Sequence, residues 1–195
     1  MTPSEPLSPI VLSTLREIMG HPYHLSRDAI IYSEVVTGEL NYKGMGEMRD
    51  VLEHLQRTIN TNNEDEALDD LTEAFEHMRR AAVESVQRAA TKEYFETLQA
   101  IRIPSLAFRV AFLDVPEKGK VRELRMNAMK KIANGRSNKA DKNKWENSIE
   151  DFKSAIENCF ELKDMFPSNV EVKYRILNIL FGTVTIIALI YAYLK

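Results

Sequence analysis

Arg49 and His54 are the residues whose types and spacing in this chain could perform chemistry. They bound the run Arg49-Asp-Val-Leu-Glu-His54, in which four residues separate a guanidinium from an imidazole. A guanidinium stabilises a phosphate, and an imidazole exchanges protons near neutral pH. Five residues turn an α-helix by about 140° beyond one full turn. We therefore expect the two side chains on opposite shoulders of one helix face, both accessible to solvent.

The same six residues resemble the Arg-polar-x-x-x-His motif of HEPN-type helical ribonucleases. The resemblance implies metal-independent RNA cleavage, with Arg49 stabilising the scissile phosphate and His54 acting as the acid–base group. It also implies that two copies of the site act together across a dimer interface. Arg16 and His21 show the same spacing elsewhere in the chain. A membrane-tethered ribonuclease is therefore the alternative function that the sequence leaves open.

Other catalytic and metal-binding patterns do not stand out in the sequence. His21, His24, His54 and His77 fall on different predicted elements, and the single cysteine, Cys159, falls on the apolar side of a helix. There is no glycine-rich phosphate loop and no serine nucleophile elbow. We predict no metal, no cofactor and no small-molecule substrate, and we consider an enzyme less favoured than a non-enzymatic role.

The elements that must position these residues are helices. The chain has 195 residues, of which only seven are Gly and seven are Pro, and 28% are charged. Long runs rich in Ala, Leu, Glu, Lys and Arg, with no alternating β-branched run, predict an all-α helical bundle of five to seven helices. One cysteine forms no internal disulfide, so we expect the domain in a reducing compartment.

Local signals predict the helix boundaries. Ser8 caps a first helix that starts at Pro9, and Ser26 caps a second. The glycine-containing stretch 41–46 is predicted to be a turn. A third helix follows, and it carries Arg49 and His54. The sequence predicts that its apolar residues share one face, and they are Met48, Val51, Leu52, Leu55 and Ile59.

The longest amphipathic run extends from about residue 64 to residue 101. Its apolar residues recur at steps of three and four, and they are Leu68, Leu71, Phe75, Met78 and Ala82. A stripe of this length suits a bundle helix or a coiled-coil helix. Both interpretations stay open, and in the second this stripe is the surface that contacts a protein partner or another copy of the chain.

The remainder of the domain is divided by composition. An apolar piece at 106–113 is predicted to be a buried helix or a membrane-surface segment, and a basic helix runs from 117 to about 133. We predict a helical bundle domain at 1–133, a basic polar linker at 134–144, a last soluble helix at 145–166, and a juxtamembrane and transmembrane helix at 167–195.

The charges are distributed unevenly along the chain. Between 117 and 144 ten Lys and Arg face three acids, whereas between 64 and 100 ten acids face four Lys and Arg. The two stretches could pack beside one another, or meet between neighbouring copies in an oligomer. The basic stretch could also contact anionic lipid headgroups or an acidic partner, and nucleic acid is a less favoured ligand because no aromatics interleave with the charges. The predicted contacts are Lys118, Lys120, Arg122, Arg125, Lys130, Lys131 and Arg136.

The last part of the chain is uncharged from residue 176 to residue 194 and reaches about 28 Å as a helix, close to the thickness of a bilayer core. We predict a single-pass span, with a core or oligomerisation helix as the alternative. Lys173 and Arg175 before it favour a domain that faces the cytoplasm, and we expect no signal peptide. The residues singled out in the span are Ile176, Asn178, Gly182, Thr183, Thr185, Tyr191 and Leu194.

These features favour a tail-anchored membrane protein whose helical domain self-associates or recruits a protein partner. A sharper version is an oligomeric effector whose spans line a pore or disrupt the membrane, because polar groups inside a span are costly unless they are paired or face a cavity. Asn178 and Thr185 share one face of the predicted helix, whereas Thr183 is offset.

Overall fold

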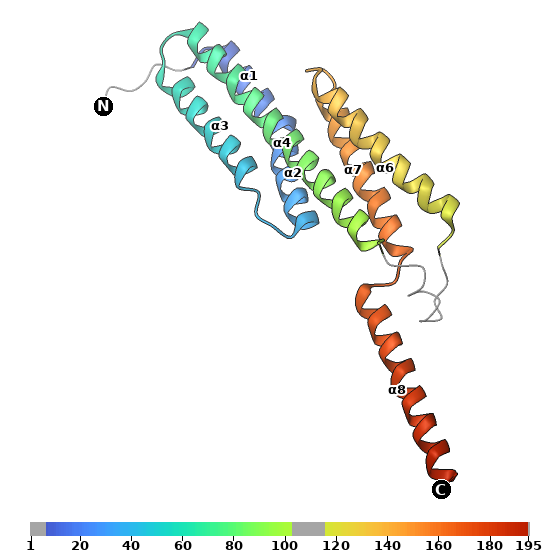
Figure 1. Cartoon of the computed structure of the whole chain (residues 1–195). Coiled ribbons are helices and arrows are strands. Elements are labelled where there is room, and N and C mark those ends of the chain that lie inside the picture. Colours follow the sequence, from blue (N-terminus) through green and yellow to red (C-terminus); the bar gives the residue numbers. More distant parts are fainter. Residues whose placement is uncertain (1–6, 103–115, 195) are drawn as a thin grey trace.

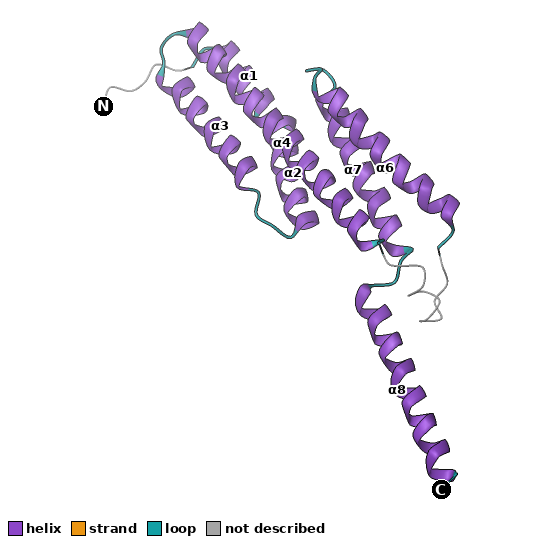
Figure 2. Ribbon diagram, in the orientation of Figure 1, coloured by secondary structure: helices purple, strands orange, loops and turns teal. Residues whose placement is uncertain are grey.

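A computed structural model describes residues 7–102 and 116–194 of the chain. Every regular element in these two ranges is a helix, which confirms the predicted all-α class (Figures 1 and 2). The predicted apolar piece at 106–113 lies outside the described residues. The helices are α1 Pro9–Ile18, α2 His21–Thr37, α3 Tyr42–Asn60, α4 Glu64–Ala100, α6 Lys118–Lys139, α7 Trp145–Asp164 and α8 Asn169–Tyr193.

Helix α4 is the axis of the domain. Its 37 residues extend for about 55 Å, and it packs against α1, α2, α3, α6 and α7. Asn63 begins it by accepting a hydrogen bond from the backbone N–H of Asp65 at 3.0 Å, and three acids in the first turn favour the positive end of the helix dipole. Because every other bundle helix contacts α4, its side chains position the rest of the domain.

The apolar stripe of α4 is the centre of the domain's own core. Leu71, Met78 and Ala82 are fully buried, and Phe75 packs between the two core clusters with its ring against the edge of Trp145. Leu68 is half-buried beside them. The stripe therefore packs within this bundle, as the bundle-helix alternative predicted, and its members Leu71, Met78 and Ala82 present no surface to a partner.

Two predicted boundaries near the start of the domain are wrong, because the residues that suggested them lie inside helices and contact a neighbouring helix. Ser26 does not cap α2; it lies buried inside the helix and donates a hydrogen bond to the backbone oxygen of Met78 at 2.8 Å. The predicted turn at 41–46 is the first part of α3. Gly44 lies there because its backbone touches neighbouring helices: an added Cβ would be 2.8 Å from Ile30 Cγ1 and 2.9 Å from Ser85 Oγ.

Helix α6 continues beyond its predicted end near residue 133, so 134–139 is helical and only 140–144 connects it to α7. Gly135, which suggested a linker, is buried, and a Cβ there would be 2.8 Å from the ring of Phe152. Its backbone oxygen accepts a hydrogen bond from Ser148 at 2.7 Å. The glycine therefore permits close packing of α6 on α7 and does not end the helix.

Helix α8 leaves the bundle after Phe166 and extends away from it (Figure 1). Ser168 caps it by accepting a hydrogen bond from the N–H of Glu171 at 3.1 Å. From Val170 to Tyr193 it is long and apolar enough to cross a membrane, and its apolar stretch is not buried against the domain. The alternative of a core helix is therefore wrong for this segment.

Candidate functional site

Arg49 and His54 both lie on α3 but have different surroundings. The Arg49 side chain is 74% exposed and binds its neighbour Asp50 at 3.0 Å. The His54 side chain is only 16% exposed and turns toward α4, where its Nδ1 lies 2.8 Å from a carboxylate oxygen of Asp70. The prediction that both side chains are accessible is thus wrong for His54, because α4 covers that shoulder of α3.

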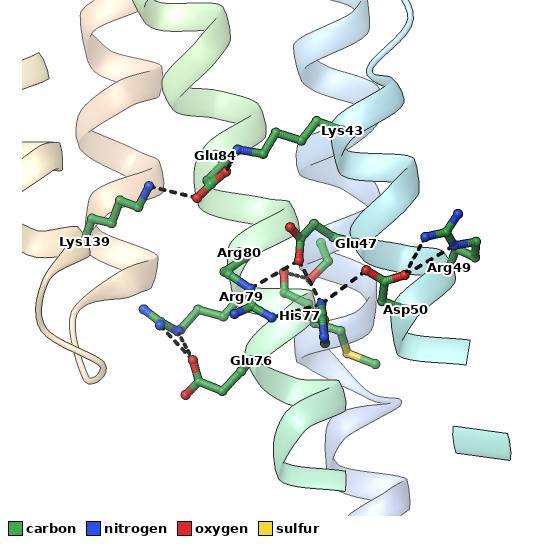
Figure 3. A network of polar contacts seen from close by, with 12 residues as sticks. Lys43, Glu47, Arg49, Asp50, Glu76, His77, Arg79, Arg80, Glu84 and Lys139 are labelled. Atoms are coloured by element: carbon green, nitrogen blue, oxygen red, sulfur yellow. Dashed lines mark hydrogen bonds and ion pairs between the residues drawn. The ribbon is translucent and has the colours of Figure 1, made fainter. Parts of the chain in front are cut away.

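A second histidine joins this contact between α3 and α4. His77 of α4 places its Nδ1 2.8 Å from Glu47 of α3, and its ring centroid lies 5.3 Å from that of His54. Because a carboxylate only accepts, each Nδ1–H donates to its acid. Arg80 donates to the same Glu47 oxygen at 3.2 Å (Figure 3).

These two His–carboxylate pairs join α3 to α4. Within the described residues no group of three or more His, Cys, Asp or Glu side chains has the arrangement of a metal site. The structure brings together two histidines that the sequence placed on separate helices. Each imidazole is hydrogen-bonded to a carboxylate. No hydrogen bond or ion pair joins Arg49 to His54 among the described residues.

The second polar feature is a surface cavity of about 580 Å³ between α3, α4 and α6, which we call the basic cavity. Its volume falls within the range of about 300–1,000 Å³ that is usual for small-molecule sites. Helix α3 contributes its first turn, and α4 contributes one face from Arg80 to Phe95. Six basic side chains line it, namely Lys43, Arg80, Arg88, Lys92, Arg136 and Lys139.

Glu84 lines this cavity and pairs with a lysine on each side of it. Lys43 of α3 contacts it at 2.5 Å and Lys139 of α6 at 3.2 Å (Figure 3). Burial, the largest influence, acts to raise the pKa of Glu84, but the hydrogen bonds and charges of the two lysines together outweigh it and leave this pKa below its ordinary value of 4.5. Glu84 is therefore an anion at neutral pH that shares one negative charge between two cations.

The floor of the cavity is a buried polar network. Asn41 is 4% exposed and Ser85 is 2% exposed. The Asn41 amide donates to Ser85 Oγ at 2.6 Å and to Ser33 Oγ at 2.9 Å, while its carbonyl oxygen accepts from the N–H of Gly44 at 3.0 Å. Because every polar group of Asn41 has a hydrogen-bond partner, this network fixes the position of the first turn of α3 against α4.

The acidic and basic stretches of the sequence pack beside one another, as one alternative predicted. Lys139 reaches Glu84 at 3.2 Å, and Lys142 reaches Glu76 at 2.7 Å. Sequence reasoning missed the basic cavity because its cations come from three helices far apart in the chain. The excess of positive charge at 117–144 was the only signal that pointed toward it.

The seven basic residues predicted to face lipid lie at different positions along α6. Lys118, Arg122, Arg125 and Lys130 are exposed, while Lys120 pairs with Glu161 at 3.2 Å and Lys131 pairs with Asp151 at 2.9 Å. Since α6 and α7 are antiparallel neighbours, the start of α6 lies at the end of the bundle from which α8 departs. Arg136 lies about 27 Å further along α6 and lines the basic cavity.

The polar side chains of α8 also divide into two kinds. Thr183 donates to the backbone oxygen of Ile179 at 2.8 Å, and Thr185 donates to that of Phe181 at 2.9 Å. These hydroxyls need no other helix and no water-filled cavity. Asn178 has no hydrogen-bond partner within the described part of the chain, and Gly182, one turn further, has open space around it.

No protein-family model matches the chain, and no curated protein or solved structure matches it either.

Proposed function

We propose that this protein is a single-pass membrane protein whose cytoplasmic helical domain acts as a non-enzymatic interaction module and self-associates in the plane of the membrane. The observation that supports this proposal is the uncovered surface of α8. Leu180, Phe181 and Ile187 are each more than half exposed, as are most apolar residues along the helix. At about 25 cal/mol per Å² such a surface is strongly unfavourable in water, and a bilayer covers it.

The proposed orientation is supported by the charges at the base of the helix. Lys173 and Arg175 lie within one turn before the uncharged segment, and basic residues are enriched on the cytoplasmic side. The cations at the start of α6, Lys118 and Arg122, lie at the same end of the bundle. Each basic residue near an anionic leaflet contributes roughly 1 kcal/mol of attraction, which falls off within a screening length of about 8–10 Å.

Association through the span is supported by Asn178. Its amide is unpaired along its own helix, and an unpaired amide is costly in hydrocarbon. A second span that presents its own Asn178 would satisfy it, with a measured range of about 0.6–2 kcal/mol for such bonds. The hydroxyls of Thr183 and Thr185 are hydrogen-bonded to backbone oxygens of their own helix. Because they do not require water in a pore, we propose a paired span.

Association through the domain is supported by the outer face of α3. Met45, Leu52 and Ile59 follow one another at seven-residue spacing and are 53%, 66% and 52% exposed. Such spacing suits pairing with another helix. Burying a large apolar side chain fully yields about 1.5–3 kcal/mol, so these half-exposed side chains together supply only a few kcal/mol.

That energy is smaller than the estimated cost of association in solution, about 4–15 kcal/mol. Tethering two domains to one membrane raises their effective concentration and lowers this cost. The proposal therefore predicts that the span and the α3 face act together. Neither surface alone should hold two copies at micromolar concentration.

The test compares the mass of the full-length protein in detergent or nanodiscs with that of a chain ending at Tyr174, which retains the buried Val172. We expect a dimer or higher oligomer for the first and a monomer for the second. Asn178→Leu should weaken the assembly, and Thr183→Val should leave it unchanged as the matched control in the same span. Leu52→Glu should weaken it from the domain side.

Monomers for both chains would contradict self-association, and α8 would then be a tether only. A protein that remains in the soluble fraction after membrane flotation would contradict the anchor itself. A ring-shaped assembly that conducts ions would favour the pore version of the effector over a paired span.

A further inference from the structure

We propose that the basic cavity is a binding site for a small, soluble, multiply phosphorylated anion of the nucleotide type. The site is distinct from the span and from the α3 face, and nothing in the proposed membrane function requires it. Its cations come from α3, α4 and α6, so it exists only in the folded domain (Figure 3).

The charges of the cavity do not balance internally. Six basic side chains line it. Among the described residues four carboxylates lie within 4.0 Å of these cations, which leaves two positive charges in excess there, and they are Glu39, Glu47, Glu84 and Glu96. Glu39 alone serves both Arg88, at 3.3 Å, and Lys92, at 2.7 Å.

Arg136 is the cation of this cavity that has no carboxylate partner among the described residues. It lines the cavity from α6. The first turn of α3, which also lines the cavity, contributes the positive end of a helix dipole. Cations from several elements around a helix N-terminus form an arrangement that suits phosphate groups.

One end of the cavity is aromatic. Phe95 lines it, and its side chain is 58% exposed. An exposed ring next to clustered cations offers a stacking face for a flat heterocycle whose phosphates lie on the basic residues. Arg80 and Phe95 lie about 22 Å apart along α4, which leaves room for a ring and a chain of phosphates.

The position of the cavity favours a soluble ligand over a lipid headgroup. Glu84 and its two lysines lie about 24 Å before the end of α4, the end of the bundle from which α8 departs. A headgroup in the bilayer surface would have to leave its leaflet to reach them. A soluble anion reaches the cavity directly from the cytoplasm.

The experiment measures binding of ATP and of inorganic tripolyphosphate to the full-length protein in phosphatidylcholine nanodiscs by calorimetry. Arg136→Glu should weaken both by about tenfold or more, since it replaces an attraction with a repulsion. Arg125→Glu is the matched control: it is an exposed arginine without an ion pair among the described residues. It lies about three turns earlier on the same face of α6, ~16 Å away and beyond the screening length.

Phe95→Ala separates a nucleotide from a simple polyanion. Stacking of a base on an aromatic side chain corresponds to about 5- to 150-fold in affinity. We expect Phe95→Ala to weaken ATP binding within this range and to leave tripolyphosphate binding unchanged. An equal effect on the two ligands, or none on either, would overturn the assignment of a ring-bearing ligand.

Three further results would overturn the proposal as a whole. The first is the absence of binding by either anion at millimolar concentration and physiological salt. The second is binding only when the nanodiscs contain a phosphoinositide, which would identify a lipid headgroup as the ligand. The third is a loss with Arg125→Glu as large as that with Arg136→Glu, which would show general charge attraction. None of these results depends on the oligomeric state.

Discussion

Two glycines on α3, Gly44 and Gly46, should respond to the same substitution with opposite sign. A Cβ added at Gly44 would meet Ile30 Cγ1 at 2.8 Å, Asn41 Nδ2 at 2.9 Å and Ser85 Oγ at 2.9 Å, all within the range that real Cβ atoms avoid. A Cβ at Gly46 would meet nothing within 4 Å. Both residues are helical, so their intrinsic gain from alanine is similar.

The magnitudes follow from two competing effects. Overpacking a well-filled contact costs about 1–3 kcal/mol, and replacing a helical glycine with alanine stabilises by about 0.5–1 kcal/mol. Gly44→Ala should therefore destabilise the domain by up to about 2.5 kcal/mol after the helix gain is subtracted. Gly46→Ala should stabilise it by up to ~1 kcal/mol.

Trp145 provides the measurement, because it is the only tryptophan and is 6% exposed in the core beside Phe75. Its fluorescence reports thermal unfolding of the full-length protein in detergent. For a chain of this size 1 kcal/mol corresponds to about 2–4 °C in Tm. Gly44→Ala should lower Tm, and Gly46→Ala should raise it. A rise in Tm for Gly44→Ala would refute the close packing of α3 against α2 and α4.

Three more outcomes are expected. The pKa of Glu84 is lowered in the folded protein, so its stabilising contribution is present above pH 4.5 and is lost as pH falls through the pKa of the folded state. The difference in Tm between the wild type and Glu84→Gln should therefore disappear in acid. A difference in Tm that does not depend on pH would contradict this. Burial raises the pKa of Cys159 to about 11, so a thiol reagent should modify it only as the protein unfolds, and rapid labelling of the folded protein would show that the core is open. His54→Ala should lower the free energy of unfolding by about 1–3 kcal/mol because it leaves Asp70 partly buried without its partner. If the wild-type protein cleaves RNA and His54→Ala abolishes that cleavage, the ribonuclease alternative is favoured instead.

The sequence predicted the helical class because periodicity and composition act locally. The ends of α4 and α7, the cap at Ser8 and the apolar run of α8 all follow from residues within a few positions of one another. Signals that depend on neighbours in space were misjudged. Gly44 and Gly135 suggested breaks, yet both are helical because another helix lies too close for a side chain.

The candidate sites show the same division. The sequence placed Arg49 and His54 on one helix, as the structure does, but only the position of α4 decided that His54 is covered and paired with Asp70. The basic cavity was beyond prediction because Lys43 and Lys139 lie almost a hundred residues apart and converge on Glu84.

What the sequence determined by itself is the helical class and the uncharged run that needs an apolar environment, since hydrogen bonding and hydrophobicity along a helix are properties of consecutive residues. Only the tertiary structure decided which apolar stripe is core, which histidine is accessible and where the cations gather. Those properties depend on which helix faces lie within a few ångströms of each other, and packing of helices sets that distance independently of their separation along the chain.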